Sequence, residues 1–200
     1  CCVGTIEMNL SAVILAGGES RRMGRDKAWL EVHGQPLIAR AMDTVHELGV
    51  EEVFISGRLG EDYSTLKCPV LLDLEPGFGP LGGIERALQA ASSPLLLVVA
   101  VDLPFMTTAF LRKVLAHCDR LTGAVPELNG NLEPLIAIYP KRCHSFASDF
   151  IARSRYAACG FAEACLKECA VKTFRVADTD TGCFTNWNSP EDAVAPSAIA

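Results

Sequence analysis

The stretch SAVILAGGESRRMGRDK, residues 11–27, joins an apolar run to a loop rich in glycine and positive charge. Its first six residues are typical of a parallel β-strand that is covered on both faces. Glycines at positions 17 and 18 lack side chains, so a ligand can approach the backbone N–H groups there. Arg21, Arg22 and Lys27 then bring to one loop three cations that suit phosphate oxygens. We therefore predict a strand that ends in an anion-binding loop.

Further apolar runs along the chain alternate with helical patterns. We expect strands at residues 52–56, 69–73, 94–102 and 134–140, helices at residues 36–48, 82–91 and 107–118, and further helical stretches between residues 143 and 169. Proline suits the start of the first of these helices, and threonines can cap the third. The alternation predicts right-handed βαβ crossovers. The expected fold class is α/β, a Rossmann-like three-layer sandwich with a mostly parallel central sheet.

Length and composition fit one domain. The chain has 200 residues, half of them apolar, which is enough to bury a sizeable core, and no repeat or linker divides it. We expect residues 1–200 to form one domain with residues 1–10 as a flexible N-terminal extension. A formal charge of −6 argues against a nucleic-acid partner. Without an apolar run of membrane-spanning length or a signal sequence, we expect a cytoplasmic protein with no membrane partner.

Nine cysteines raise the question of a disulfide framework or a zinc site. Their number is odd and no C-x-x-C pair occurs, which favours free thiols. Cys159, Cys165 and Cys169 can share one helix face, where cysteines usually act as small apolar fillers. We therefore expect buried free thiols.

Carboxylates follow two of the expected strands. Asp73 ends one apolar run and Asp102 ends another. Ligands of open α/β sheets bind at the carboxyl ends of strands, and an idle carboxylate beside a buried strand is costly. Mg²⁺ is typically held by one or two carboxylates together with substrate phosphates. Although neither the G-x-G-x-x-G nor the P-loop signature occurs, the three strand ends together suit a nucleoside triphosphate with Mg²⁺.

Four motifs, in this order, resemble the molybdenum cofactor guanylyltransferases of the nucleotidyltransferase superfamily. They are LAGGESRRMGRDK (residues 15–27), GPLGGIERAL (79–88), VAVDLPF (99–105) and NWNSPED (186–192). The resemblance runs from about residue 11 to 192 and implies the fold of the nucleotide-diphospho-sugar transferases. The double glycine is similar to guanylyl-transferring members, whereas cytidylyl-transferring relatives more often show L-A-A-G. One departure is the shorter RMGRDK, with Arg25 where many members have glycine.

The resemblance also implies a set of site residues. For nucleotide and acceptor binding they are Leu15, Ala16, Gly17, Gly18, Arg21, Lys27, Ser56, Asp73, Gly82, Asp102, Asn186 and Asn188. Catalysis is expected from Arg22, Lys27 and Asp102, with Asp102 as the ligand of Mg²⁺. The position of Ser56 is asparagine in some members. Asn186 and Asn188 match a terminal pattern that is expected near the pterin.

The implied reaction is transfer of GMP from GTP to the terminal phosphate of molybdopterin, with or without molybdenum, and release of pyrophosphate. That phosphate is already anionic at neutral pH, so positioning and charge neutralisation suffice. We assign no catalytic role to the four histidines, His33, His46, His117 and His144, and expect them to lie at the surface or in helices without a partner. Molybdoenzymes and other cofactor-biosynthesis proteins are expected partners. Cytidylyl transfer to the same pterin, nucleotidyl transfer to a sugar phosphate, and a non-catalytic nucleotide-binding homologue remain alternatives.

Overall fold

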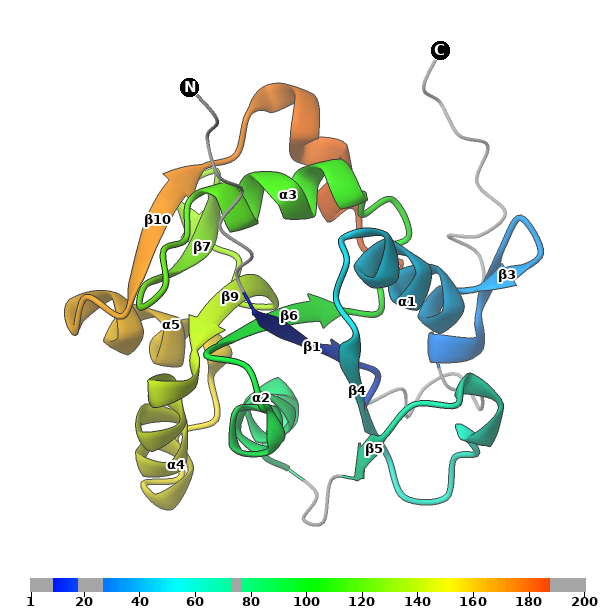
Figure 1. Cartoon of the computed structure of the whole chain (residues 1–200), viewed down its shortest axis with the longest axis horizontal. Coiled ribbons are helices and arrows are strands. Elements are labelled where there is room, and N and C mark those ends of the chain that lie inside the picture. The colour runs from blue at the N-terminus through cyan, green and yellow to red at the C-terminus, as the bar shows by residue number, and fades with distance from the viewer. Residues whose placement is uncertain (1–8, 18–26, 73–76, 188–200) are drawn as a thin grey trace.

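The computed structural model describes residues 9–17, 27–72 and 77–187 (Figure 1). At its centre, a β-sheet follows the order β10-β7-β9-β6-β1-β4-β5, with β8 paired to β7. Four neighbouring strands are parallel, namely β6 (Leu95–Ala100), β1 (Leu10–Leu15), β4 (Glu52–Gly57) and β5 (Val70–Leu72). These are the first four strands predicted from the sequence, and the mostly parallel α/β sheet is confirmed. β1 begins at Leu10, so Leu10 belongs to the sheet and not to the expected N-terminal extension. Residues 1–8 lie outside the described part.

The other half of the sheet differs from the expected series of crossovers. β9 (Ile136–Pro140) runs antiparallel to both β6 and β7 (Gly123–Leu128). β8 (Asn131–Leu132) folds back on β7 as a hairpin, and β10 (Val171–Arg175) lies parallel to β7 at the sheet edge. Only residues 133–135 separate β8 from β9. Both β8 and β9 run antiparallel to β7, so the chain reverses before β8, in the two-residue turn of Asn129 and Gly130, where both residues have a positive φ.

Helices cover both faces of the sheet (Figure 1). One face carries α1 (Leu37–Glu47) and α3 (Thr108–Ala116), and the other carries α2 (Gly79–Ala90), α4 (His144–Ala152) and α5 (Ala158–Lys167). The three-layer arrangement is confirmed. Thr107 caps α3 as expected, because its hydroxyl accepts the N–H of Phe110 at 3.2 Å. α2 begins three residues earlier than predicted, with Pro80 in its first turn.

Shorter elements connect these layers. They are the 3₁₀ helices η1 (Lys27–Trp29), η2 (Ser64–Leu66), η3 (Lys141–Cys143) and η4 (Asp178–Phe184), and the hairpin of β2 (Glu31–Val32) with β3 (Gln35–Pro36). None of the described helices has both the length and the apolar character required to cross a membrane.

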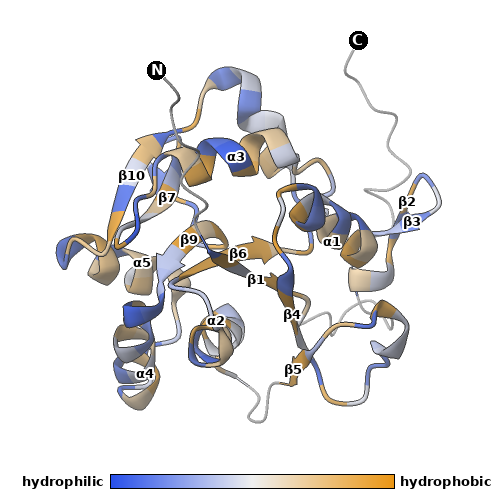
Figure 2. Ribbon diagram, in the orientation of Figure 1, coloured by the Kyte–Doolittle hydropathy of each residue, from blue (hydrophilic) through white to orange (hydrophobic). Residues whose placement is uncertain are grey.

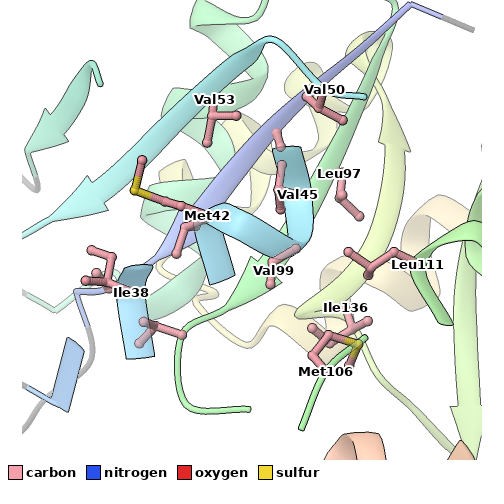
Figure 3. Close-up of a cluster of buried hydrophobic side chains, with 14 of the residues drawn as sticks. Ile38, Met42, Val45, Val50, Val53, Leu97, Val99, Met106, Leu111 and Ile136 are labelled. Carbon is pink, nitrogen blue, oxygen red and sulfur yellow. The ribbon is translucent and has the colours of Figure 1, made fainter. Parts of the chain in front are cut away.

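Two apolar cores lie on opposite faces of the sheet. Ala12 and Ile14 of β1 face one core, and Val13 and Leu15 face the other, as the two-residue period of a strand requires. Figure 3 shows the first core, where side chains of α1 pack against those of β4 and β6. In Figure 2 the central strands are apolar, and polar residues lie on the outer sides of the helices. The sheet is therefore buried on both faces, as its apolar strands predict.

A polar network satisfies the amino ends of β1 and β4. The hydroxyl of Ser11 donates to the carboxylate of Glu52, which also accepts the N–H of Ser92 at 2.9 Å. The N–H of Ser93 donates to the Ser11 hydroxyl at 3.2 Å. Burial acts to raise the pKa of Glu52, but the hydrogen bonds from Ser11 and Ser92 outweigh it and hold this pKa below its usual value. The polar side chains of Ser11 and Glu52 therefore find their hydrogen-bond partners within the protein.

The cysteines are free thiols in all seven described positions, as expected. Cys143 and Cys165 are buried in the core beneath α4 and α5. Cys159 and Cys169, however, are exposed, so the expectation of burial is wrong for these two. The reason is that α5 turns only one face to the sheet, and Cys169 follows the end of the helix.

Gly123 yields a test of the packing between β7 and β9. A Cβ atom at this position would overlap the carbonyl oxygen of Ile138 on β9. Gly123→Ala should therefore lower the free energy of unfolding by about 2 kcal/mol or more, in the range of overpacked cores. Gly182→Ala is the matched control, since open space surrounds that position, and it should change stability by less than about 0.5 kcal/mol. Urea denaturation measures both, and equal midpoints for the two variants would contradict the prediction.

Candidate active site

The carboxyl ends of β1, β4 and β6 meet at one edge of the sheet. Leu15 is in register with Ser56 on β4 and with Ala100 on β6. Two backbone hydrogen bonds continue this alignment beyond the strands: Ala16 N–H donates to Ser56 O at 2.9 Å, and Val101 N–H donates to Leu15 O at 3.2 Å. The segment after β1 and the segment after β6 therefore leave the sheet side by side.

The segment after β1 presents mainly backbone. Leu15 and Ala16 are buried, with 8% and 2% of their surfaces exposed, and Gly17 is half-buried. A ligand at this edge would therefore meet main-chain groups and the open face of the glycine, as the sequence predicts. These three residues lie at the carboxyl edge of the sheet, where ligands of open α/β sheets bind, and their contacts with a nucleotide stay predictions.

Asp102 and Lys27 come together at the same edge. Asp102 follows the last residue of β6 by two positions and is half-buried. Burial raises the pKa of its carboxyl group, and the Lys27 ammonium at the start of η1 acts in the opposite direction without cancelling the rise. The two side chains are thus near enough to interact. A carboxylate that is kept partly desolvated beside a cation is typical of a functional site.

Asp102 can offer a carboxylate to Mg²⁺ at this edge. The backbone N–H of Asp102 donates a hydrogen bond to the carboxylate of the same residue, which acts to lower its pKa. No group of three or more His, Cys, Asp or Glu side chains gathers within residues 9–17, 27–72 and 77–187. Mg²⁺ needs no such cage, because waters and substrate phosphates usually complete its shell. The donor chemistry of Asp102 therefore fits Mg²⁺ bound together with a triphosphate.

The first turns of α2 pack against this edge from the other face. A Cβ on Gly83 would overlap the hydroxyl of Ser56 and lie 3.0 Å from Cδ2 of Leu15. A Cβ on Gly82 would lie 2.9 Å from that of Phe78. Both glycines therefore let the helix approach closely. Ser56, with 3% of its surface exposed, belongs to this helix–strand packing, so its nucleotide contact and that of Gly82 stay predictions.

The segment from η4 to Trp187 returns to the site. The N–H of Trp187 donates to the carbonyl of Asp102 at 3.0 Å. An ion pair of 2.7 Å between Lys113 and Asp180 ties η4 to α3. Asn186 is exposed directly before Trp187, so the structure brings this predicted residue to the Asp102 side of the site. The sequence reasoning missed the anchoring role of Trp187, although the NWN motif contains it.

Five predicted site residues lie outside the described part of the chain and keep the status of predictions. They are Gly18, Arg21, Arg22, Asp73 and Asn188.

The expectation that the histidines have no partner is wrong for His117, whose Nδ1 atom lies 2.8 Å from the carbonyl oxygen of Lys113, and for His144. The Nε2 atom of His144 lies 2.8 Å from Oε1 of Glu85, and the Ser148 hydroxyl donates to the same oxygen at 2.9 Å. These contacts join α4 to α2. His117 stacks on the ring of Phe174 at 4.0 Å. Both roles are structural.

Residues 12–159 match the family model described as the MobA-like NTP transferase domain. The chain therefore belongs to the MobA-like NTP transferase family, a class of nucleotidyltransferases. A probable molybdenum cofactor guanylyltransferase from Opitutus terrae is 34% identical over 186 residues, which cover 92% of each chain. Within the family, the chain is thus a member of the molybdenum cofactor guanylyltransferases, as its four motifs predict.

Two further proteins are similar. A probable molybdenum cofactor guanylyltransferase from Pelotomaculum thermopropionicum is 41% identical over 136 residues, covering 68% of this chain and 66% of its own. The crystal structure of molybdopterin-guanine dinucleotide biosynthesis protein A from Archaeoglobus fulgidus matches with a TM-score of 0.71, covering 92% of this chain and 95% of that one. Its 23% identity shows the shared fold.

The raised pKa of Asp102 yields a prediction about stability. Its folded-state pKa lies above the usual value of about 4, so the stability gained from the protonated form is complete below pH 4 and is lost as the pH rises through the folded-state pKa. At pH 7 the charged carboxylate therefore lowers stability. Asp102→Asn should unfold at a higher urea concentration than the wild type at pH 7, and the difference should shrink toward pH 4. Asp178→Asn, at an exposed position, is the control, and a lower midpoint for Asp102→Asn at pH 7 would refute the prediction.

The close approach of Gly83 yields a prediction about the nucleotide. Gly83→Ala would force α2, or the side chains of Ser56 and Leu15, to shift at the edge where the nucleotide is expected. A misplacement of about 1 Å can cost about 10²-fold in catalysis, so we take a loss of about 10-fold in affinity as the expected effect. We expect weaker GTP binding in calorimetric titrations. Gly160→Ala on α5 is the control, because its nearest neighbour would be 3.5 Å from the new Cβ. Equal GTP affinity in both variants would show that the position of α2 does not matter for the nucleotide.

Proposed function

We propose that this protein transfers GMP from GTP to the terminal phosphate of molybdopterin, with or without bound molybdenum, forming molybdopterin guanine dinucleotide and pyrophosphate. The observation that carries the proposal is the interaction of Lys27 with a half-buried Asp102 at the carboxyl edge of β1 and β6. A cation and a carboxylate at this edge suit a triphosphate with its metal. The guanylyltransferase relative that covers 92% of the chain supports the choice of base and acceptor.

The proposed reaction is a displacement at the α-phosphorus of GTP. An oxygen of the acceptor phosphate forms a new P–O bond, while the bond to the oxygen that bridges the α- and β-phosphorus breaks and its electron pair leaves with pyrophosphate. A phosphate monoester carries a charge of about −1.5 to −2 at pH 7, so no side chain has to remove a proton. The protein therefore acts by aligning the two phosphates and neutralising their charge.

The described residues divide this work among them. The backbone of residues 15–17 would lie against the nucleotide, where Gly17 leaves room for it. Lys27 would neutralise phosphate charge, and Asp102 would hold Mg²⁺. When bound, Mg²⁺ supplies electrostatic stabilisation of the phosphoryl oxygens. Asn186, next to the anchored Trp187, would face the acceptor.

The remaining predicted residues complete the proposal. Arg21 and Arg22 would join Lys27 at the triphosphate, Gly18 and Asp73 would contact the nucleotide, and Asn188 would contact the pterin. A cytoplasmic location and contacts with molybdoenzymes or other cofactor-biosynthesis proteins likewise stay predictions.

Pyrophosphate release tests the proposed function. The purified protein is incubated with Mg²⁺, GTP or CTP, and molybdopterin or a sugar 1-phosphate. We expect release with GTP and molybdopterin, and a loss of about 10²–10³ in kcat/KM for Asp102→Asn and for Lys27→Ala, the size seen when one electrostatic group is removed. Asp178→Asn, at an exposed position, should leave turnover unchanged.

Each alternative has its own signature in this experiment. A preference for CTP would replace the guanylyl assignment, and release only with the sugar phosphate would replace the acceptor. Binding of GTP without release under any condition would indicate a non-catalytic homologue. Guanosine binding separates two effects of Lys27→Ala, because loss of charge neutralisation weakens GTP alone, whereas collapse of the loop weakens both ligands.

A further inference from the structure

A half-buried carboxylate that the function has not yet used lies on the β9 side of the site. Glu133 stands between β8 and β9, and its side chain has no hydrogen-bond partner among the residues that the structure describes. β9 is antiparallel to β6, with Ile136 in register with Val99, so β9 begins at the edge where β6 ends. The turn that contains Glu133 is therefore part of the same edge as Asp102.

Hydrogen bonds hold this turn in place. The N–H of Glu133 donates to Pro126 O at 2.9 Å, and Ile136 N–H donates to Glu133 O at 3.2 Å across Pro134. The carbonyl of Pro134 accepts the hydroxyl of the fully buried Tyr139 at 3.0 Å. Bonds to β7 and β9 thus fix the backbone of Glu133 before any ligand arrives, which lowers the entropy that binding must overcome.

The next residue of the turn connects it to β6. Ala100 N–H donates to Leu135 O at 2.9 Å, two residues before Asp102. In the strand order β9-β6-β1-β4, the proposed nucleotide residues Leu15 to Gly17 and Ser56 lie at the carboxyl ends of β1 and β4, whereas Glu133 precedes β9. Asp102 follows β6, which lies between them. The acceptor must reach the α-phosphorus from outside the surface that the nucleotide covers, and the β9 side of Asp102 lies outside the strand ends assigned to the nucleotide.

The chemistry of Glu133 selects what can bind there. Burial raises the pKa of its carboxyl group, and no opposing ion pair contributes to this pKa. An ionised carboxylate only accepts hydrogen bonds, and its two oxygens match two adjacent N–H donors, as they do in pairs with arginine. It repels phosphate. The 2-amino-4-oxo edge of a pterin ring carries such a donor pair, namely a ring N–H beside an exocyclic amine.

We propose that the Glu133 carboxylate accepts the paired N–H donors of the acceptor's pterin ring and so determines acceptor specificity. This inference rests on the proposed function, because that function makes a pterin the acceptor. Glu133 binds the ring while the phosphate at the other end of the acceptor reaches the nucleotide. It takes no part in bond formation.

The test compares Glu133→Gln with the wild type in the full-length chain. Glutamine keeps the size of the side chain but replaces one acceptor oxygen with an N–H donor. The binding probe is free pterin, which carries the donor edge without a phosphate, followed by its own fluorescence. We expect pterin affinity to fall 10-fold or more, and KM for molybdopterin to rise by a similar factor. KM for GTP, affinity for guanosine and kcat should not change.

Glu127→Gln is the matched control. Glu127 is a half-buried carboxylate on β7 at the same edge, in register with Leu132. This variant should bind pterin and molybdopterin as the wild type does. An equal loss in both variants would show that negative charge at the edge, and not a specific contact of Glu133, governs acceptor binding, and the proposal would fail.

Three other results would overturn the proposal. The first is equal pterin affinity in the wild type and Glu133→Gln, or no pterin binding by either. The second is a loss of guanosine affinity in Glu133→Gln, which would assign the residue to guanine, whose edge carries the same donor pair. The third is a higher Mg²⁺ requirement for GTP binding, which would make it a metal ligand. Glu133-dependent pterin binding without guanylyl transfer would contradict the proposed function alone.

Discussion

The pairing of β1 with β4 on one side and β6 on the other is the constraint on which the rest of the structure depends. All six residues of β1 are buried, and alternate side chains enter the cores on the two faces. A slip of one residue would exchange these side chains between the cores, so the register is strongly specified. That register sets Leu15 level with Ser56 and Ala100. The shared edge of the site follows directly from it.

Carboxylates at the two ends of the sheet have pKa values shifted in opposite directions. At the amino end, hydrogen bonds from Ser11 and Ser92 hold the pKa of Glu52 low against the effect of burial. At the carboxyl end, burial raises the pKa of Asp102 and of Glu133. The first carboxylate is satisfied by the protein itself. The other two keep a capacity to bind external charge or N–H donors, which is the usual property of groups at functional sites.

The sequence predicted one half of the sheet better than the other. The four parallel strands are continuous apolar runs, and such runs are visible in a local window. β7 was missed because its sequence GAVPEL contains glycine and proline, both of which disfavour strands, and it forms through pairing with β9 and β10. The direction of β9 depends on the turn of Asn129 and Gly130 that reverses the chain after β7, which no apolar pattern encodes. The exposure of Cys159 was likewise set by which face α5 turns to the sheet.

The sequence by itself determined the class of chemistry. A strand followed by glycines and cations, carboxylates after two other strands, and four motifs in order are all properties of contiguous residues, and together they indicate a nucleotidyltransferase of this family. Only the tertiary structure decided which of these residues meet. The Lys27 ammonium acts to lower the pKa of Asp102, and the N–H of Trp187 donates to the Asp102 carbonyl. Gly83 lets α2 approach Ser56 and Leu15 closely. Each of these contacts joins segments far apart in the chain, so it exists only after strand pairing and helix packing have fixed their positions.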